Sequence, residues 1–312
     1  MSSVAVIGEL NLDLIVTGAP GLPEPGIEKI VEGMELTLGS SSAILVAQLA
    51  RLGDDVLFIS KVGGDDFGRR ALEFLRAKGV PTDAIAVEAS LRSGLTISIA
   101  VDGERAMLTQ LGSIQELRWR DVNFDLLRGR RHLHISSFYL QRNLRPDIGR
   151  IFERTHAMGL STSLDTGWPS DEEINGDLAA VWPHTDVFLP NEVEAMQLTG
   201  CGTVEEALDV LSARVPTVVI KLGPEGAIAR QGGRTVRRAA FVVDVVETTG
   251  AGDSFNGGFL HAYLDSADLA DCVDLGLACG SLSIRAVGGT TSQPTLEEAL
   301  GFIATAPRRN HA

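Results

Sequence analysis

The sequence predicts an α/β fold with a mainly parallel central sheet, helices covering both faces of that sheet, and a small β lid. Two observations support this class. Short β-branched runs alternate with helical segments along most of the chain, which is typical of parallel strands joined by crossover helices. A pair of β-rich runs around Asp102-Gly103, a strong hairpin signal, breaks that alternation.

The elements of the main sheet follow one another in a regular order. We expect strands at residues 4–7, 56–60, 132–136, 160–165, 186–189, 217–221 and 242–246. We expect helices at residues 44–52, 67–78, 147–158, 192–198, 204–213, 255–264, 272–284 and 296–303. Gly53, Gly79 and Gly159 each directly follow a helical segment, and glycine is a good helix stop. Ligands of such sheets bind beyond the carboxyl ends of the strands.

The lid is expected from two parts of the chain, about 12–36 and 92–112. Strands at 96–101 and 105–110 would form its hairpin, and the segment near 15–35 would complete a small separate sheet. A small sheet hinged on a large domain can close over a bound ligand. An edge hairpin of the main sheet is the alternative.

Composition limits the possible partners. The chain has 312 residues and a net charge of -14, so it has no electrostatic attraction for nucleic acids or for anionic membranes. An anionic nucleotide would have to be held by local amides, a metal ion and a few cations. We predict a single domain over 1–312 with a loose tail at 306–312. The lid sheet could also form a homodimer contact.

Three scattered cysteines without a CxxC pair argue against a disulfide framework. No segment has the form of a signal peptide or of a membrane span of about 20 apolar residues. The expected location is therefore the cytoplasm. His132 and His134 alternate along an expected strand and are assigned a structural or solvent-facing role.

The strongest chemical signal is the string from Glu247 to Phe255, ETTGAGDSF, between an expected strand and an expected helix. Glycines at such a turn let the backbone approach a ligand closely. The first amides of the helix have no internal partners and form an anion site together with the helix dipole. Asp253 lies among them and could accept a proton from an attacking hydroxyl. Alone, Asp253 could also be a simple helix N-cap.

This string closely resembles the C-terminal signature of the ribokinase-like (PfkB) carbohydrate kinase family. The resemblance implies a ribokinase-like fold, with Asp253 as general base and Gly250, Ala251 and Gly252 supplying anion-hole amides. Other segments match the family in its order, from the first strand nearly to the C-terminus.

The resemblance also implies a substrate site near the start of the chain. Residues 8–13, GELNLD, look like the family's opening motif, so Asn11 and Asp13 are expected to bind substrate hydroxyls; as ordinary turn residues they would have no such role. Gly39 and Ser40 match a second signature. The family usually has two glycines there, and an asparagine that often contacts the sugar at the position of Ile44, so these departures concern the substrate and not the reaction. Arg105 in the lid is a candidate partner for a sugar-acid carboxylate.

Nucleotide and metal residues follow the later strands. Asn191 and Glu194 match the family's NxxE element, and their oxygens would suit Mg²⁺ held largely through water. A capping arrangement of the same two residues is the alternative, and the two roles could coexist. The segment 221–226, KLGPEG, resembles the family's nucleotide loop.

The nucleotide-binding candidates are Lys221, Gly223, Gly226, Asn191, Thr249 and Gly280. A plain turn with a surface lysine is the alternative for the 221–226 loop. Asp165 ends a strand where the family often carries an aspartate, but no role is assigned to it. Some family members bind K⁺ through an aspartate at the position of Glu247, so a K⁺ site there is an open question.

These residues together predict an ATP-dependent phosphotransferase that phosphorylates a hydroxyl of a small sugar or sugar derivative, with ATP and Mg²⁺ as cofactors and K⁺ as a further candidate. A nucleoside kinase of the adenosine type is the alternative among enzymes. A non-catalytic sugar- or nucleotide-binding regulator on the same fold is the alternative outside them.

Overall fold

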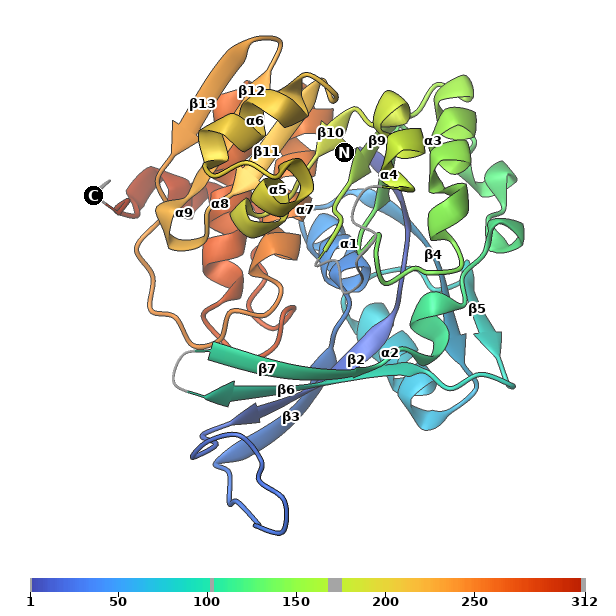
Figure 1. Cartoon of the computed structure of the whole chain (residues 1–312), viewed down its shortest axis with the longest axis vertical. Coiled ribbons are helices and arrows are strands. Elements are labelled where there is room, and N and C mark those ends of the chain that lie inside the picture. The colour runs from blue at the N-terminus through green and yellow to red at the C-terminus, as the bar shows by residue number, and fades with distance from the viewer. Residues whose placement is uncertain (1, 102–103, 168–175, 310–312) are drawn as a thin grey trace.

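A computed structural model of the chain describes residues 2–101, 104–167 and 176–309. Within this part the chain forms two sheets (Figure 1). The larger sheet has the strand order β13-β12-β11-β10-β9-β8-β1-β4-β5. Its strands are β1 (Ser3–Ile7), β4 (Asp55–Gly63), β5 (Ile85–Glu88), β8 (His132–Ile135), β9 (Ser161–Leu164), β10 (Val187–Phe188), β11 (Thr217–Lys221), β12 (Ala227–Gln231) and β13 (Arg234–Arg238). Strands from β11 to β5 are parallel, and β12 and β13 add an antiparallel hairpin at one edge.

Helices cover both faces of this sheet, as the sequence predicts. They are α1 (Ser41–Arg51), α2 (Asp66–Ala77), α3 (Ile148–Ala157), α4 (Leu178–Val181), α5 (Glu192–Thr199), α6 (Val204–Ser212), α7 (Ala251–Leu264), α8 (Leu269–Ser283) and α9 (Leu296–Thr305). Short 3₁₀ turns lie at 112–115, 119–121, 124–127, 145–147, 182–184 and 223–225.

The core consists of two apolar clusters, one on each face of the large sheet. Side chains of successive strand residues point to opposite faces. Along β1, Val4 and Val6 therefore join the cluster formed with α1, α2, α7 and α8, whereas Ala5 and Ile7 join the cluster formed with α3 to α6. Figure 1 shows these helices on the two sides of the sheet.

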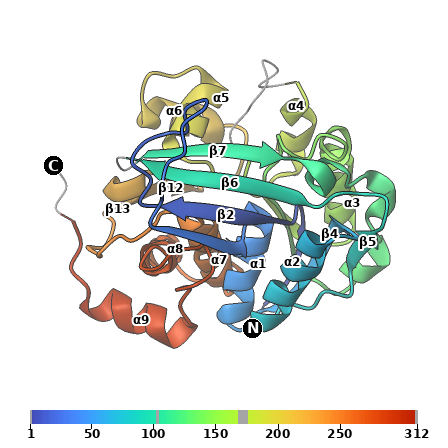
Figure 2. The same cartoon turned by 90° about the horizontal axis from the view of Figure 1, so that it is seen from below.

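A second sheet of four strands lies apart from the first, with the order β3-β2-β6-β7. Its strands are β2 (Asn11–Thr17), β3 (Gly33–Leu38), β6 (Gly94–Val101) and β7 (Glu104–Gln110). The view from below in Figure 2 shows it as a separate layer across one end of the molecule. The predicted hairpin thus belongs to a small sheet of its own, and not to an edge of the main sheet. We call this sheet the lid.

The prediction of a strand at 242–246 is wrong. The segment is extended but pairs with no strand among the described residues, apart from one isolated bridge between Phe241 and Arg308. Over residues 306–309, the described part of the predicted loose tail, the backbone is hydrogen-bonded to the 240–242 segment. The Val242 amide donates to the Pro307 carbonyl at 2.9 Å, and the Arg309 amide donates to the Ala240 carbonyl at 2.8 Å. Residues 310–312 lie outside the described residues.

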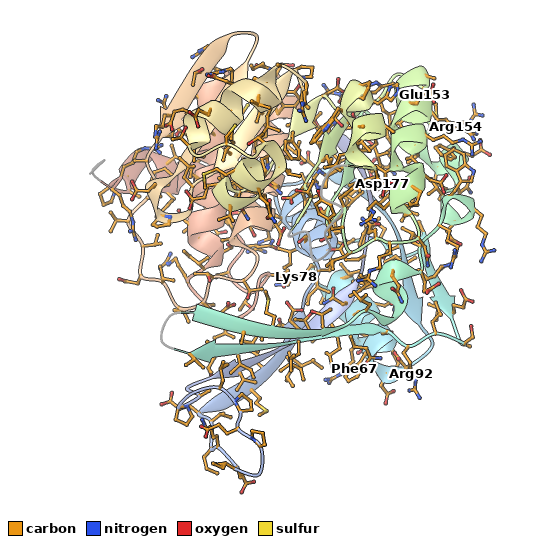
Figure 3. The ribbon with its side chains drawn as sticks, viewed as in Figure 1. Phe67, Lys78, Arg92, Glu153, Arg154 and Asp177 are labelled. Carbon is orange, nitrogen blue, oxygen red and sulfur yellow. The ribbon has the colours of Figure 1, made fainter. Side chains whose placement is uncertain are left out.

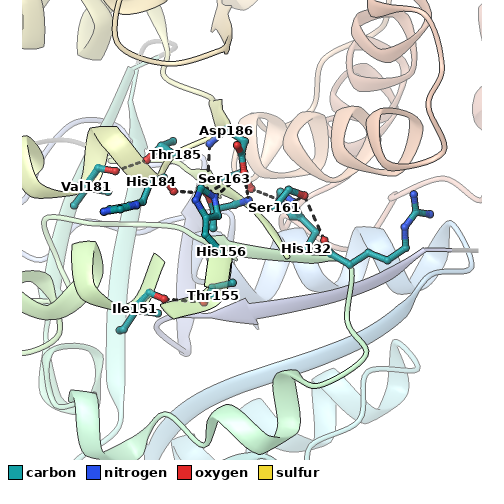
Figure 4. Close-up of polar contacts among 12 residues, drawn as sticks. His132, Ile151, Thr155, His156, Ser161, Ser163, Val181, His184, Thr185 and Asp186 are labelled. Atoms are coloured by element: carbon teal, nitrogen blue, oxygen red, sulfur yellow. Dashed lines mark hydrogen bonds and ion pairs between the residues drawn. The ribbon is translucent and has the colours of Figure 1, made fainter. Parts of the chain in front are cut away.

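Two neighbouring strands carry a buried polar row. Both ring nitrogens of His132 lie within hydrogen-bond distance of serine hydroxyls, at 2.8 Å from Ser161 and 2.7 Å from Ser163 (Figure 4). His134 likewise contacts Ser163 at 2.7 Å and Ser136 at 2.8 Å. Burial lowers the pKa of both histidines to about 3, so both are neutral and structural at physiological pH.

Candidate active site

The carboxyl ends of three adjacent parallel strands bring polar residues together. Asp165 follows β9, Asn191 follows β10, and Lys221 ends β11. A bridge between Asn191 and Lys221 extends the pairing of β10 and β11 past the strand ends. This is the edge of the sheet at which α/β proteins bind ligands.

Lys221 forms a buried ion pair at this edge. Its ammonium donates to Asp165 Oδ2 at 2.7 Å and to Asn256 Oδ1 at 3.3 Å. Asn256, from α7, also donates to Asp165 at 2.6 Å. Burial alone would lower the pKa of Lys221, but the Asp165 and Glu194 carboxylates raise it above its usual value. Lys221 is therefore a fixed positive charge beside the start of α7.

The capping arrangement of Asn191 and Glu194 is present. Asn191 Oδ1 accepts the Glu194 amide at 2.8 Å, and Glu194 Oε2 accepts the Asn191 amide at 2.9 Å. Glu194 is buried, and burial together with the nearby Asp165 charge raises its pKa to about 7. Within the described part of the chain, its other oxygen, Oε1, has no hydrogen-bond partner. Cap and metal-binding roles can therefore coexist.

The first turn of α7 has the free amides that an anion site needs. Gly250 is the N-cap, and its φ of 74° is in the left-handed region that favours glycine. The Ala251 amide makes one long contact, 3.4 Å, to the Thr248 carbonyl. The amides of Gly252 and Asp253 have no acceptor among the described residues.

Asp253 lies in this turn with its side chain partly exposed. Burial and the neighbouring Asp165 charge raise the pKa of Asp253 to about 7, although Lys221 acts in the opposite direction. A Cβ added to Gly252 would lie 3.5 Å from Lys221 Nζ, so the ammonium is next to the free amides. A carboxylate with a pKa near neutrality is suited to act as a general base.

A mainly apolar cavity of about 350 Å³ lies beside this turn. Its size is within the usual range for small-molecule sites. Among the described residues it is lined by Lys221, Gly223, Pro224, Gly226, Ala240, Phe241, Val243, Val245, Thr248, Ala251, Gly252, Phe255, Leu277, Gly280, Ser281, Ile284 and Arg309. Four of the six predicted nucleotide residues, Lys221, Gly223, Gly226 and Gly280, are thus in one cavity wall.

The other two nucleotide candidates lie elsewhere. Asn191 caps α5, and Thr249 donates to Glu247 from both its amide, at 2.7 Å, and its hydroxyl, at 2.6 Å. Its neighbour Thr248 lines the cavity instead. The apolar wall of the cavity was not predicted from the sequence. Phe241, Val243 and Val245 alternate, but this period of two belongs to an extended segment along the cavity and not to a strand of the sheet.

The predicted substrate residues meet where the lid joins the large sheet. Asn11 Nδ2 donates to Asp13 Oδ1 at 3.0 Å, and both side chains are buried. A Cβ added to Gly39 would lie 2.1 Å from Asp13 Oδ1, so only glycine leaves room for this carboxylate. Arg105, in β7, pairs with Ala100 of β6, but the Arg105 side chain lies outside the described residues.

Ser40 adopts a backbone conformation that favours glycine. A hydrogen bond to Glu9 offsets the energetic cost of that conformation. Ser40 has φ 72° and ψ 124°, an unfavourable backbone conformation for any residue other than glycine. Its hydroxyl donates to the Glu9 carbonyl at 2.6 Å and accepts the Ala43 amide at 3.0 Å. Ser137, with φ 51°, donates to Glu9 Oε1 at 2.9 Å. Glu9 therefore holds two strained serines beside the substrate residues.

Glu247 does not fit a K⁺ site well. Its Oε1 accepts two hydrogen bonds from Thr249, and its Oε2 accepts the Gly288 amide at 3.4 Å. Both oxygens are therefore occupied by hydrogen-bond donors, which a cation would have to displace or share.

Mg²⁺ fits better. Glu194 is a buried carboxylate with a raised pKa and an oxygen without a hydrogen-bond partner among the described residues, and a bound cation would favour its ionised form. Glu194 would hold Mg²⁺ through water, and the ion would neutralise charge on the phosphates of ATP.

Comparisons with known proteins identify the family. Residues 1–296 match the pfkB family carbohydrate kinase model. The chain is 34% identical over 248 residues to an uncharacterized sugar kinase of Archaeoglobus fulgidus, covering 79% of this chain and 98% of that protein. It is 27% identical to the ribokinase of Haemophilus influenzae, covering 96% and 98%.

Solved structures show the same fold. A protein described as ribokinase II from E. coli, in complex with ATP and Mg²⁺, superimposes with a TM-score of 0.86 at 25% identity, covering 97% of this chain and 99% of that one. An adenosine kinase from Sinorhizobium meliloti has a TM-score of 0.82 at 24% identity, covering 96% and 98%. The fold and the relatives define an ATP-dependent phosphotransferase that acts on a hydroxyl group. The chain belongs to the pfkB family of carbohydrate kinases.

No helix in residues 2–101, 104–167 or 176–309 has both the length and the apolar character to cross a membrane.

Proposed function

We propose that this enzyme transfers the γ-phosphate of ATP to a hydroxyl of a small sugar or sugar derivative, with Asp253 as the general base. The observation that carries the proposal is the first turn of α7, where a carboxylate with a pKa of about 7 lies among amides that have no acceptor in the described chain. Phosphoryl transfer to a hydroxyl needs both a base for the attacking oxygen and positioned donors for the charge on the transferred group.

The nucleotide is assigned to the 350 Å³ cavity. Its apolar wall, with Phe241 and Val243, would contact the nucleobase, and Lys221 would lie toward the phosphates as a fixed cation. Glu194 would hold Mg²⁺ through water. These positions direct the γ-phosphate toward the amides of residues 250–253.

The acceptor is assigned to the junction with the lid. Asp13 can accept hydrogen bonds from two adjacent hydroxyls, and Asn11 fixes the position of Asp13. Asp253 would take the proton of the attacking hydroxyl, while the amides of Gly252 and Asp253 hold the charge on the transferred group. A sugar is favoured over a nucleoside because a sugar kinase at 34% identity and a ribokinase at 27% identity match this chain over most of its length.

A substrate panel tests the proposal. ADP release is measured with ATP, Mg²⁺ and, in turn, neutral sugars, sugar acids and nucleosides. We expect turnover with a sugar well above the rate with water alone. If only a nucleoside stimulates ADP release, the nucleoside alternative replaces the sugar; if ligands bind without any ADP release, the base assignment is wrong.

The pH dependence of kcat/KM is a second test. Asp253 accepts a proton only when ionised, so kcat/KM for the acceptor should fall about tenfold per pH unit below about pH 7 and level off above it. The measurement uses saturating ATP and Mg²⁺, because a bound cation keeps Glu194 ionised and removes its contribution. A profile that is flat from pH 5 to pH 8 would contradict the raised pKa of Asp253.

A further inference from the structure

Lys78 makes an unusual contact with a distant loop. It is the C-cap of α2, and its ammonium donates to the Thr290 carbonyl at 2.6 Å. The side chain is half-buried, and in the view of Figure 3 it lies between the lid and the C-terminal elements. The contact joins two parts of the chain that are 212 residues apart.

No described carboxylate forms an ion pair with this ammonium, and the other charge close to it is the guanidinium of Arg51. Burial and that like charge lower the pKa of Lys78. A half-buried cation without a counter-charge costs stability, so a plain structural contact is a poor explanation for it.

Thr290 belongs to a tight turn that packs against the anion site. The turn is closed by the Thr291 amide, which donates to the Gly288 carbonyl at 3.2 Å. A Cβ added to Gly250 would lie 2.9 Å from Gly289 Cα, so the two backbones are in close contact. Gly250 is the N-cap that orients the amides of Gly252 and Asp253. A shift of the turn would therefore shift those amides.

The same turn also contacts the lid and Glu247. A Cβ added to Gly288 would lie 2.8 Å from Thr37 Cγ2, on β3. The Gly288 amide reaches Glu247 Oε2 at 3.4 Å. Glu247 thus holds one end of the turn by accepting a hydrogen bond, and Lys78 holds the other end by donating one.

We propose that the Lys78 ammonium is a built-in cation that fixes the 288–291 turn against the anion site, so that this kinase needs no monovalent cation there. An ammonium group and K⁺ carry the same charge and both bind carbonyl oxygens. Lys78 supplies that charge from within the chain, at the Thr290 carbonyl oxygen, which a free cation would otherwise coordinate. Lys78 is a positioning residue, and the proposal rests on the proposed role of the 250–253 amides.

The first experiment compares the wild-type enzyme in K⁺, Na⁺ and tetramethylammonium chloride at equal ionic strength. We expect kcat to stay within about twofold across the three salts, because a cation without a site shifts no equilibrium. Activation by K⁺ of about fivefold or more would overturn the proposal, since it would show that the wild-type enzyme still binds and uses a cation that Lys78 does not replace.

The second experiment uses Lys78→Met, with Arg70→Met as the control, since Arg70 is an exposed cation on the same helix. In Na⁺, Lys78→Met should lower kcat about 10- to 100-fold, as expected for loss of a charged hydrogen bond, with little change in the KM for ATP. Added K⁺ or ammonium should restore part of kcat and raise Tm in Lys78→Met only. Lys78→Ala, which opens more room for an ion, should show the same rescue.

Unchanged kcat in both Lys78 variants, or loss without any response to K⁺ in kcat and Tm, would overturn the proposal. The Tm readout does not depend on turnover. If no acceptor is phosphorylated by the wild-type enzyme, the proposed function fails, while the selective Tm response of Lys78→Met to K⁺ still decides whether Lys78 replaces a cation.

Discussion

Asp253→Asn is expected to lower kcat by about 10²–10⁴-fold, the usual contribution of a general base. The amide keeps the shape of the side chain but cannot accept the proton of the attacking hydroxyl. ATP binding should be preserved, because Asp253 is not among the residues that line the nucleotide cavity. Steady-state kinetics and calorimetric titration with ATP measure the two effects separately.

The unfolding free energy of Asp253→Asn serves as the control for its loss of activity. The pKa of Asp253 is raised in the fold, from 3.8 to about 7, so the ionised form is disfavoured in the folded protein. The unfolding free energy therefore falls as pH rises from about 4 to about 7, and this penalty is complete above pH 7. Asp253→Asn removes it and should raise the unfolding free energy at pH 8 by about 1–3 kcal/mol. Near-normal turnover in a stable variant would exclude Asp253 from the mechanism.

Lys221→Met is expected to lower the unfolding free energy by about 3–5 kcal/mol, the cost of breaking a buried ion pair at one partner. The substitution leaves the Asp165 carboxylate buried without a counter-charge, with the Asn256 side chain at 2.6 Å and the Gly167 amide at 3.1 Å as its remaining described donors. It also removes the cation next to the free amides, so kcat should fall as well. Urea unfolding at pH 7 measures the stability change.

The double variant Lys221→Met/Asp165→Asn separates these effects. The double variant no longer contains a buried Asp165 carboxylate without its cation, and at least half of the lost stability should return. Activity should not return, because the fixed positive charge is still missing. If the unfolding free energy of Lys221→Met alone is within about 1 kcal/mol of the wild-type value, the Lys221–Asp165 pair is too solvated to stabilise the fold.

Local patterns predicted most of the elements that position the site. Phe255, Phe259 and Tyr263 are four residues apart, a spacing that is typical of a helix, and they lie on α7. Their rings stack there with centroid distances of 6.3 Å and 5.8 Å. The turn before it was predicted from its glycines, because glycine marks where backbone must approach a ligand. The Asp102-Gly103 signal likewise placed the hairpin of the lid, although those two residues lie outside the described chain.

Features that depend on distant contacts could not be predicted. The extended segment at 242–246 has the composition of a strand, and only the tertiary structure shows that it lines a cavity and pairs with 307–309. The β12–β13 hairpin could not be predicted because β13, Arg-Thr-Val-Arg-Arg, is mostly exposed and lacks the apolar run of a buried strand. The Lys78 contact spans 212 residues and leaves no local pattern at all.

The pairing of Glu9 with two left-handed serines restricts the order in which this region could change. Glycine at position 40 would adopt the same backbone without help, whereas serine there costs about 1–3 kcal/mol unless its hydroxyl is held. Ser40 keeps its 2.6 Å hydrogen bond to the backbone carbonyl of residue 9 whatever side chain that residue carries, whereas Ser137 donates to the Glu9 carboxylate at 2.9 Å. Loss of the Glu9 side chain should therefore be tolerated best after position 137 has become glycine. A lineage that loses the Glu9 side chain first would pass through a less stable intermediate, so Glu9 and Ser137 should be exchanged together or with glycine first.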